Sequence, residues 1–122
     1  SKLYEANLSW ANLTGAKLGR ARLIAANLSE ANLSEADLEA ADLSEADLRE
    51  TTLSFANLKS AILRRANLKG ADLREANLTE ADLSQAKLSW ANLGRAKVSQ
   101  AQLEQVADLE GLILPDGSAY KG

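Results

Sequence analysis

Leucine recurs at every fifth residue along almost the whole chain, and this period constrains the fold more than any other feature. Leucine stands at position 3 and at every fifth position up to 103, with only Val98 breaking the run. Alanine precedes it by two residues at 19 of the 20 positions from 6 to 101, with only Thr51 differing. Such an internal repeat has to be interpreted before any local propensity.

A helix does not satisfy this period. Five residues at about 100° each advance a helix by about 140°, so the leucines would point to every side, and an all-round apolar helix does not suit a soluble chain. Alanine and the leucine two residues later instead match the period of a strand, so both point the same way. The next alanine follows after three residues, so the chain must turn between each leucine and the next alanine.

The residues between each leucine and the next alanine favour such turns. Glycine stands there at 15, 19, 70 and 94, and serine at 9, 29, 34 and 44, and both are common in turns. Asn or Asp fills 13 of the 20 positions between alanine and leucine, where it points outward and can bond nearby backbone or stack in ladders. Short strands joined by corners make a winding tube, but the residues alone leave the number of corners per coil open.

Three inward residues give specific expectations. Leu53 and Leu58 should be fully buried in the middle of such a tube. Thr51 replaces an inward alanine, so its hydroxyl should bond a backbone carbonyl, because a buried unpaired hydroxyl is costly.

Residues 31–48, ANLSEADLEAADLSEADL, resemble the pentapeptide-repeat family, whose consensus is A(D/N)LXX, and the resemblance covers residues 3–103. It implies an all-β solenoid, a right-handed quadrilateral β-helix with four pentapeptides per coil. About five coils, stacked about 4.8 Å apart, would make a rod about 25 Å long.

The repeat changes in residues 99–111, SQAQLEQVADLEG. Leu103 and Val106 follow helical spacing, and Ser99 with Gln102 three residues later forms a capping-box pattern. We expect a short helix, from about residue 99 to 108, that covers the last coil. One more ordinary strand is the alternative.

The last residues are expected to close the rod. Gly111 could end the helix, and the segment LILPDGSAYKG resembles the close of many bacterial family members, in which one more strand follows the helix. Pro115–Gly117 then forms a turn that ends this strand. Val106 puts the next Ala-Asp-Leu one residue out of phase. We therefore divide the chain into a repeat body, residues 1–98, and a C-terminal cap, residues 99–122.

The N-terminal end carries the candidate interaction surface, which consists of Tyr4, Trp10 and Ile24. They are either scattered surface residues, which are normal, or a contact surface for an upstream segment, another domain or a second subunit. An open strand edge is a template for pairing, so we expect any self-association to run through this end. The chain starts at Ser1 without methionine and already within the repeat, so we also expect a segment upstream.

The sequence offers little for catalysis. It contains no histidine and no cysteine, which removes the commonest general base, the commonest metal ligand and any disulfide. Glu30 and Glu50 would stack about 4.8 Å apart, near the ~5–5.5 Å carboxyl spacing of retaining glycosidases, but a convex face has no cleft to desolvate them. We expect no enzymatic activity, no cofactor and no metal site.

Charge and hydropathy limit the partners. The net charge of −3 argues against nucleic-acid binding. No run of 18 apolar residues exists, so we expect no membrane span, and no signal peptide is visible, so we expect a soluble protein that is cytoplasmic rather than exported. The candidate acidic surface consists of Glu30, Glu35, Asp37, Glu39, Asp42, Glu45, Asp47 and Glu50.

These features favour a non-catalytic structural or protein-interaction module, a rigid rod that presents a surface to an unknown protein partner or an upstream domain. Some members of the resembled family match B-DNA in size and charge and inhibit type II topoisomerases, so a DNA-mimic inhibitor of gyrase is the alternative. A continuous acidic stripe would favour mimicry, and alternating bands of charge would favour a scaffold.

Overall fold

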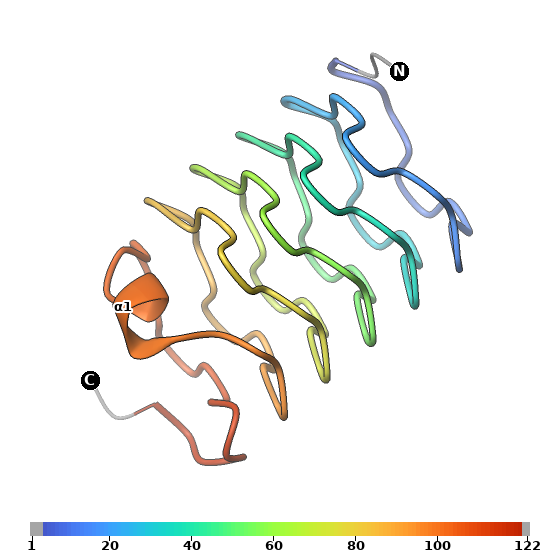
Figure 1. The fold of residues 1–122 in the computed structure, drawn as a ribbon. Helices are drawn as coiled ribbons and strands as arrows, with labels where there is room; N and C mark the ends of the chain where they lie inside the picture. The colour runs from blue at the N-terminus through green and yellow to red at the C-terminus, as the bar shows by residue number, and fades with distance from the viewer. Residues whose placement is uncertain (1–3, 121–122) are drawn as a thin grey trace.

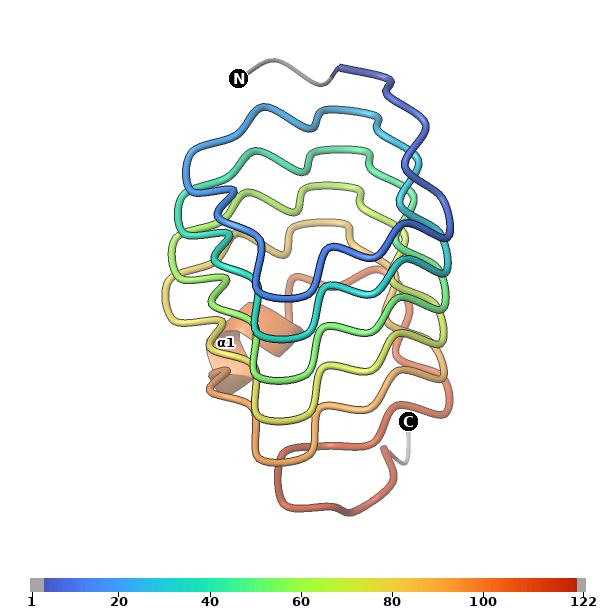
Figure 2. The same ribbon diagram turned by 90° about the vertical axis from the view of Figure 1, so that its right-hand side faces the viewer.

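The computed structural model describes residues 4–120, and the chain winds in stacked coils around one axis (Figures 1 and 2). Isolated parallel bridges join the coils, and each bridge links residues 20 apart, from Asn7 with Asn27 to Asn77 with Lys97. A step of 20 residues corresponds to four pentapeptides. The chain is therefore a β-helix in which each side of a coil is one pentapeptide.

The interior is made of leucine and alanine. Every inward side chain from residue 21 to 93 is at most 5% exposed, and the predicted burial of Leu53 and Leu58 is confirmed, since both are fully buried. The hydroxyl of Thr51 donates to the carbonyl of Leu48 at 2.9 Å, as predicted. Leu3, the first leucine of the repeat, lies outside the described residues.

Backbone hydrogen bonds account for four of the five N–H groups in a typical pentapeptide. The first residue donates across the preceding turn, the second donates to the previous coil, and the third and fifth donate to the next coil. In residues 26–30 the donors Ala26, Asn27, Leu28 and Glu30 reach the carbonyls of Leu23, Ala6, Asp47 and Arg49 at 3.0, 2.8, 2.8 and 2.9 Å.

The N–H of the fourth residue is left over, and asparagine or aspartate at the second position accepts it. The Ser29 N–H donates to Oδ1 of Asn27 at 3.0 Å, and the Ser29 hydroxyl donates to the same oxygen at 2.7 Å. All 13 Asn and Asp residues at this position of the repeat accept the equivalent bond. The prediction that these outward side chains bond nearby backbone is confirmed.

The fifth residue of each repeat has a left-handed backbone, which the sequence pattern did not predict. Within residues 4–120, seventeen non-glycine residues have a positive φ, between 56° and 65°, and all stand at the fifth position. With the bond from the next alanine N–H back to the leucine carbonyl, this is the pattern of a type II turn. This conformation costs an L-residue about 1–2 kcal/mol of free energy. Its N–H bond to the next coil offsets part of that cost.

The 20-residue step ends at a one-turn helix, α1, which spans Gln100–Leu103 (Figure 1). The predicted capping box is present, because the Gln102 N–H donates to Ser99 Oγ and the Ser99 N–H donates to Gln102 Oε1. The predicted extent, residues 99–108, is wrong. The Ala107 N–H already donates to a carbonyl of the preceding coil, so the ladder draws the chain out of the helix.

A side-chain amide docks α1 on the last coil. Gln102 Nε2 donates to the carbonyls of Leu78 and Ala81 at 2.7 and 2.9 Å. Leu103 is 7% exposed and packs on the core, while Val106 is only half-buried.

The chain then returns to the ladder with a different step. Lys87 pairs with Asp108 and Asn92 with Ile113, so the step is 21 residues and the phase shift predicted at Val106 is present. Gly111 does not end the helix but lies in a later turn. The predicted turn at residues 115–117 reverses the chain, and Ala119 then pairs antiparallel with Ile113.

Gly15 and Gly111 give a matched test of the left-handed turns, because both have a φ of +68°. A Cβ at Gly15 would meet nothing within 4 Å, whereas a Cβ at Gly111 would collide with the ring of Trp90. Gly15→Ala should lower the free energy of unfolding by about 1–2 kcal/mol, from conformation alone. Gly111→Ala should lower it further, because the ring must also move.

Gly19→Ala is the control for this pair, since Gly19 has no positive φ and its Cβ would lie 3.7 Å from the nearest atom, the Glu39 carbonyl oxygen. It should be neutral or slightly stabilising. Urea unfolding of the three variants provides the comparison. Equal effects at all three positions would contradict the role assigned to the fifth residue.

Candidate interaction surface

The three residues predicted as an N-terminal contact surface do not lie on one side of the rod. Tyr4 and Trp10 are 62% and 72% exposed, and Ile24 is half-buried. Tyr4 and Ile24 hold equivalent positions in neighbouring coils, which the bond from the Glu5 N–H to the Ile24 carbonyl joins at 3.0 Å. Trp10 belongs to the next turn along the chain. The structure thus separates a Tyr4–Ile24 pair from a tryptophan on the following corner.

The eight predicted acidic residues encircle the rod instead of forming one face. They come from consecutive pentapeptides between residues 26 and 50, and four pentapeptides complete a coil. Six are exposed, whereas Asp42 and Asp47 are half-buried. Glu30 and Glu50 hold equivalent positions in neighbouring coils, as expected. We call the eight residues the acidic belt.

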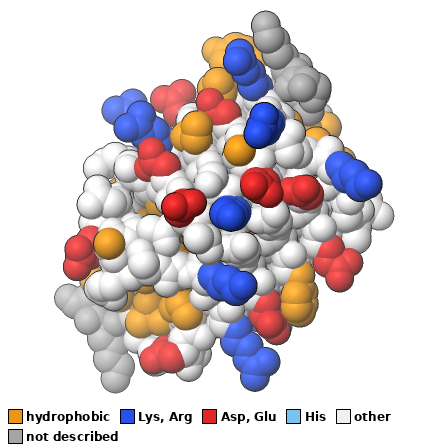
Figure 3. All heavy atoms as spheres, in the orientation of Figure 1, with side chains coloured by type: hydrophobic (Ala, Val, Ile, Leu, Met, Phe, Trp, Pro, Cys, Tyr) orange, Lys and Arg blue, Asp and Glu red, His pale blue; other side chains and the backbone are white. Residues whose placement is uncertain are grey.

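Basic side chains interrupt the acidic surface. Figure 3 shows acidic and basic side chains interspersed over the face that it draws. Each ion pair between coils has side chains at least 37% exposed, so it contributes little to stability. These pairs are Arg64–Asp82 at 2.9 Å, Arg65–Glu45 at 3.8 Å and Arg95–Glu75 at 3.9 Å.

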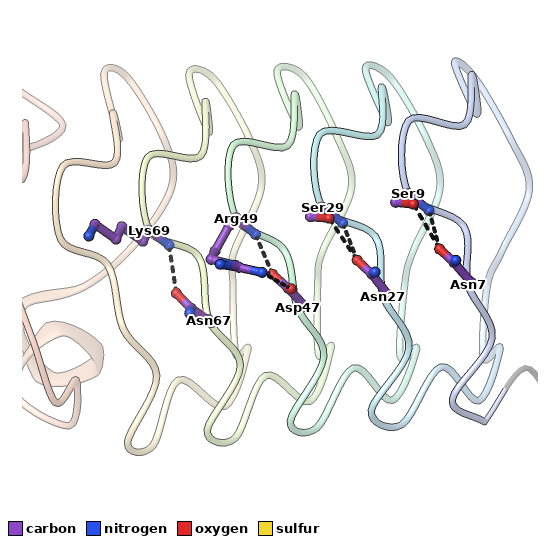
Figure 4. Close-up of polar contacts among 8 residues, drawn as sticks. All are labelled: Asn7, Ser9, Asn27, Ser29, Asp47, Arg49, Asn67 and Lys69. Atoms are coloured by element: carbon purple, nitrogen blue, oxygen red, sulfur yellow. Dashed lines mark hydrogen bonds and ion pairs between the residues drawn. The ribbon is translucent and has the colours of Figure 1, made fainter.

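Both tryptophans lie along one side of the rod. Bridges stack residues 7, 27, 47, 67 and 87 on this side, and Figure 4 shows four of these layers. Trp10 and Trp90 stand at the fifth position of the first and last layers, so they share one column. We call it the tryptophan side, and it consists of residues 6–10, 26–30, 46–50, 66–70 and 86–90.

Two exposed aromatic residues of the repeats were not assigned to any surface by the sequence. Phe55 and Trp90 are 58% and 59% exposed. Both stand at the fifth position of the repeat, whose side chain cannot point inward. The repeat pattern alone could therefore have predicted that they are exposed. The Trp90 ring lies against Gly111, because a Cβ there would collide with it.

An ion pair reinforces the turn in the middle layer of the tryptophan side (Figure 4). Arg49 Nε donates to Asp47 Oδ1 at 2.8 Å, and Arg49 Nη2 lies 2.6 Å from Asp47 Oδ2. The hydrogen bond from the Arg49 side chain lowers the pKa of Asp47 below its usual value. Arg74 lowers the pKa of Asp72 in the same way on the next side.

Neither a metal site nor a membrane span is found in residues 4–120. In this part of the chain, no group of three or more acidic residues could hold a metal ion. Across the same residues, no helix is long and apolar enough to cross a membrane.

Comparison with known families identifies the class of protein. The sequence model of pentapeptide repeats matches residues 6–44, 26–65 and 61–100, with eight copies. The chain therefore belongs to the pentapeptide-repeat family, whose solved members form right-handed quadrilateral β-helices. The predicted family is confirmed.

Solved structures of the family include similar proteins. Rfr23, a pentapeptide repeat protein from the cyanobacterium Cyanothece 51142, is 43% identical over 79% of this chain, with a TM-score of 0.58, and this chain spans only 58% of its length. HetL from Nostoc sp. strain PCC 7120, involved in heterocyst differentiation regulation, is 38% identical over 98% of this chain and 68% of its own, with a TM-score of 0.41. No curated protein matches the sequence significantly.

A more distant structure is QnrB1, a plasmid-mediated fluoroquinolone resistance protein. It is 18% identical over 91% of this chain and 71% of its own, with a TM-score of 0.45. A similarity at this level carries no argument about the function of this chain.

Asp47→Asn should make stability less dependent on pH in the acid range. Because the pKa of Asp47 is lowered by folding, its charged form stabilises the protein above the unfolded pKa of about 3.9, and this contribution is lost as the pH falls through the folded value. Asparagine keeps the side-chain oxygen that accepts the backbone N–H of Arg49, as Asn27 and Asn67 accept the equivalent N–H in their layers. Unlike aspartate, it does not titrate.

Urea unfolding at a series of pH values below about 4 measures the difference. The unmodified protein should lose more stability than the variant over this range. Asp72→Asn should behave alike, because Arg74 pairs with Asp72 in the same geometry. Identical pH profiles for the variant and the unmodified protein would contradict the assignment.

Proposed function

We propose that this chain is a non-catalytic module that binds a protein partner through the apolar side chains at its N-terminal end. One observation carries the proposal. The outward column that begins with Tyr4 and Ile24 continues in the following coils with Ser44, Arg64 and Ser84. The same position is thus apolar only at this end, where an apolar contact surface would be of use to a partner.

The fold supports a role in presenting a surface. Nearly every backbone donor is bonded within the rod, so the body is rigid and a surface on it is preorganised, which lowers the entropic cost of binding. Leu8, Leu13 and Leu18 are only partly buried, so the proposed surface adjoins a part of the core that is incompletely covered. The partner that suits it is a protein segment with apolar side chains, from an upstream domain or from another chain.

The division into a repeat body, residues 1–98, and a C-terminal cap, residues 99–122, belongs to the same proposal. The change of the ladder step from 20 to 21 residues at Val106 supports this boundary, as does α1. Ala119 pairs with Ile113 and covers part of the last edge, which leaves fewer groups there to template further pairing. Binding is therefore directed to the N-terminal end.

The test is capture of proteins from an extract of the source organism by the immobilised chain. Tyr4→Ser with Ile24→Ser should reduce capture of a specific partner by about tenfold or more, because a lost apolar anchor costs more than 1.4 kcal/mol. Phe55→Ser is the matched control, since Phe55 is 58% exposed on another side, and it should leave capture unchanged. Equal capture by all three proteins would overturn the proposal.

The acidic belt raises a second candidate, mimicry of DNA. The acidic belt includes all eight acidic residues between 30 and 50, but it encircles only part of the length of the rod. Residues 21–40 hold one basic and four acidic residues, whereas residues 81–100 hold three basic and one acidic. A DNA mimic needs a continuous acidic surface, because it replaces a regular row of phosphates.

We accordingly expect no inhibition of gyrase supercoiling at micromolar concentrations of this protein. Inhibition in a supercoiling assay would favour mimicry. In that case, reversing the charge of Glu35, Asp37 and Glu39 should abolish the inhibition, and reversing Lys59 should not.

A further inference from the structure

We propose that the tryptophan side is a homodimer interface, in which a second copy of this chain packs antiparallel to the first. This inference goes beyond the proposed function, because it concerns another surface and names the partner. Self-association through the N-terminal end stays a separate prediction. Three observations on the tryptophan side carry the inference. They are the order of its charges, the position of the Trp90 ring over Gly111, and the smooth outer surface of this side.

From layer 26–30 to layer 86–90 the charges on this side change sign only once along the rod, and the next layer, residues 107–111, is acidic again at Asp108 and Glu110. Asp47 and Arg49 neutralise each other in their ion pair. The remaining charges are acidic at residues 30 and 50 and basic at residues 69 and 87. None of these four takes part in an ion pair within the described residues. On the side that holds residues 16–20, in contrast, the sign alternates from coil to coil.

This order of charges selects an antiparallel arrangement. A two-fold axis that lies in the interface, between the layers 46–50 and 66–70, places the acidic layers 26–30 and 46–50 opposite basic layers of the second copy, and places the acidic layer 107–111 opposite the uncharged layer 6–10. Glu50 then faces the layer of Lys69, and Glu30 faces the layer of Lys87. A parallel arrangement would place like charges opposite one another, which is repulsive.

The same axis brings the tryptophans together. It places the layer of Trp10 opposite the layer of Gly111 in the second copy. The Trp90 ring lies over Gly111, so Trp10 meets that ring at each end of the interface. Aromatic pairs of this kind contribute about 0.5–1.5 kcal/mol beyond the area that they bury. The charges and the aromatic residues therefore specify one register.

The surface between the two tryptophans is smooth enough for close approach. Asn7, Asn27 and Asn67 hold their side chains against their own turns, as Figure 4 shows. Ser89 is buried, and the Glu50 carboxylate lies flat over Gly70, where a Cβ would collide with it. Six layers about 4.8 Å apart and about 10 Å wide give a footprint of about 290 Å², far below the ~800 Å² per partner of a standard interface. The dimer is therefore weak.

A charge swap tests the register. In sedimentation equilibrium of the full chain at concentrations up to about 1 mM and low salt, Glu50→Lys and Lys69→Glu should each weaken dimerisation about tenfold. The chain with both substitutions should return to within about threefold of the unmodified protein, because the swapped charges face each other again across the axis. A purely structural effect of either substitution would not be reversed by the other.

Aromatic substitutions test the same interface independently. Trp10→Ser should weaken dimerisation about tenfold, which corresponds to about 1.4 kcal/mol, and Phe55→Ser should have no effect. The chain contains no cysteine, so Glu50→Cys mixed with Lys69→Cys should form a mixed disulfide faster than either variant pairs with itself.

Three outcomes would overturn the inference. The protein could remain monomeric at about 1 mM, the double charge swap could fail to restore association, or Trp10→Ser could leave dimerisation unchanged. Its failure is distinguishable from failure of the proposed function. The Tyr4→Ser, Ile24→Ser chain should lose partner capture but keep the dimer, and the Lys69→Glu chain should do the reverse.

Discussion

The hydrogen bond that 13 repeats make from the N–H of the fourth residue to the Asn or Asp side chain two residues earlier is the interaction on which most corners of the rod depend. The backbone ladder and the turns use four N–H groups per pentapeptide and leave this one over. An unpaired backbone donor is costly, and it would recur at every corner. The side-chain oxygen pairs it locally, as Asn27 does for Ser29, so the chain can turn every five residues and still bury leucine and alanine.

Because this hydrogen bond is made within one repeat, the other outward residues are free to vary. The fourth and fifth residues contribute little to the core, so they can be charged, aromatic or small without altering the coil. Two different surfaces result on one scaffold, the apolar pair Tyr4–Ile24 and the tryptophan side. The fifth position has a further constraint, because its left-handed backbone strains every non-glycine residue. The ladder tolerates this strain, since nearly all of the strained N–H groups bond the next coil.

The C-terminal end shows how the repeat stops. At Gln102 the residue type changes from Asn or Asp to a longer amide, which reaches the carbonyls of Leu78 and Ala81 and docks α1 on the coil. A single extra residue, Val106, then shifts the ladder step from 20 to 21. Small local changes thus convert a repeating edge into one that is partly covered.

The sequence by itself determined the strand parity, the buried leucines, the role of Thr51, the capping box at Ser99 and the phase shift at Val106, because each depends on residues near one another in the chain. Only the tertiary structure decided which layers are neighbours, how the acidic belt is distributed and that Trp90 leans on Gly111. These depend on the 20-residue step, which the residues alone left open and only the family resemblance implied. The extent of α1 also lay beyond the sequence, because helical spacing and strand register overlap in residues 99–109 and the ladder bond of Ala107 decides between them.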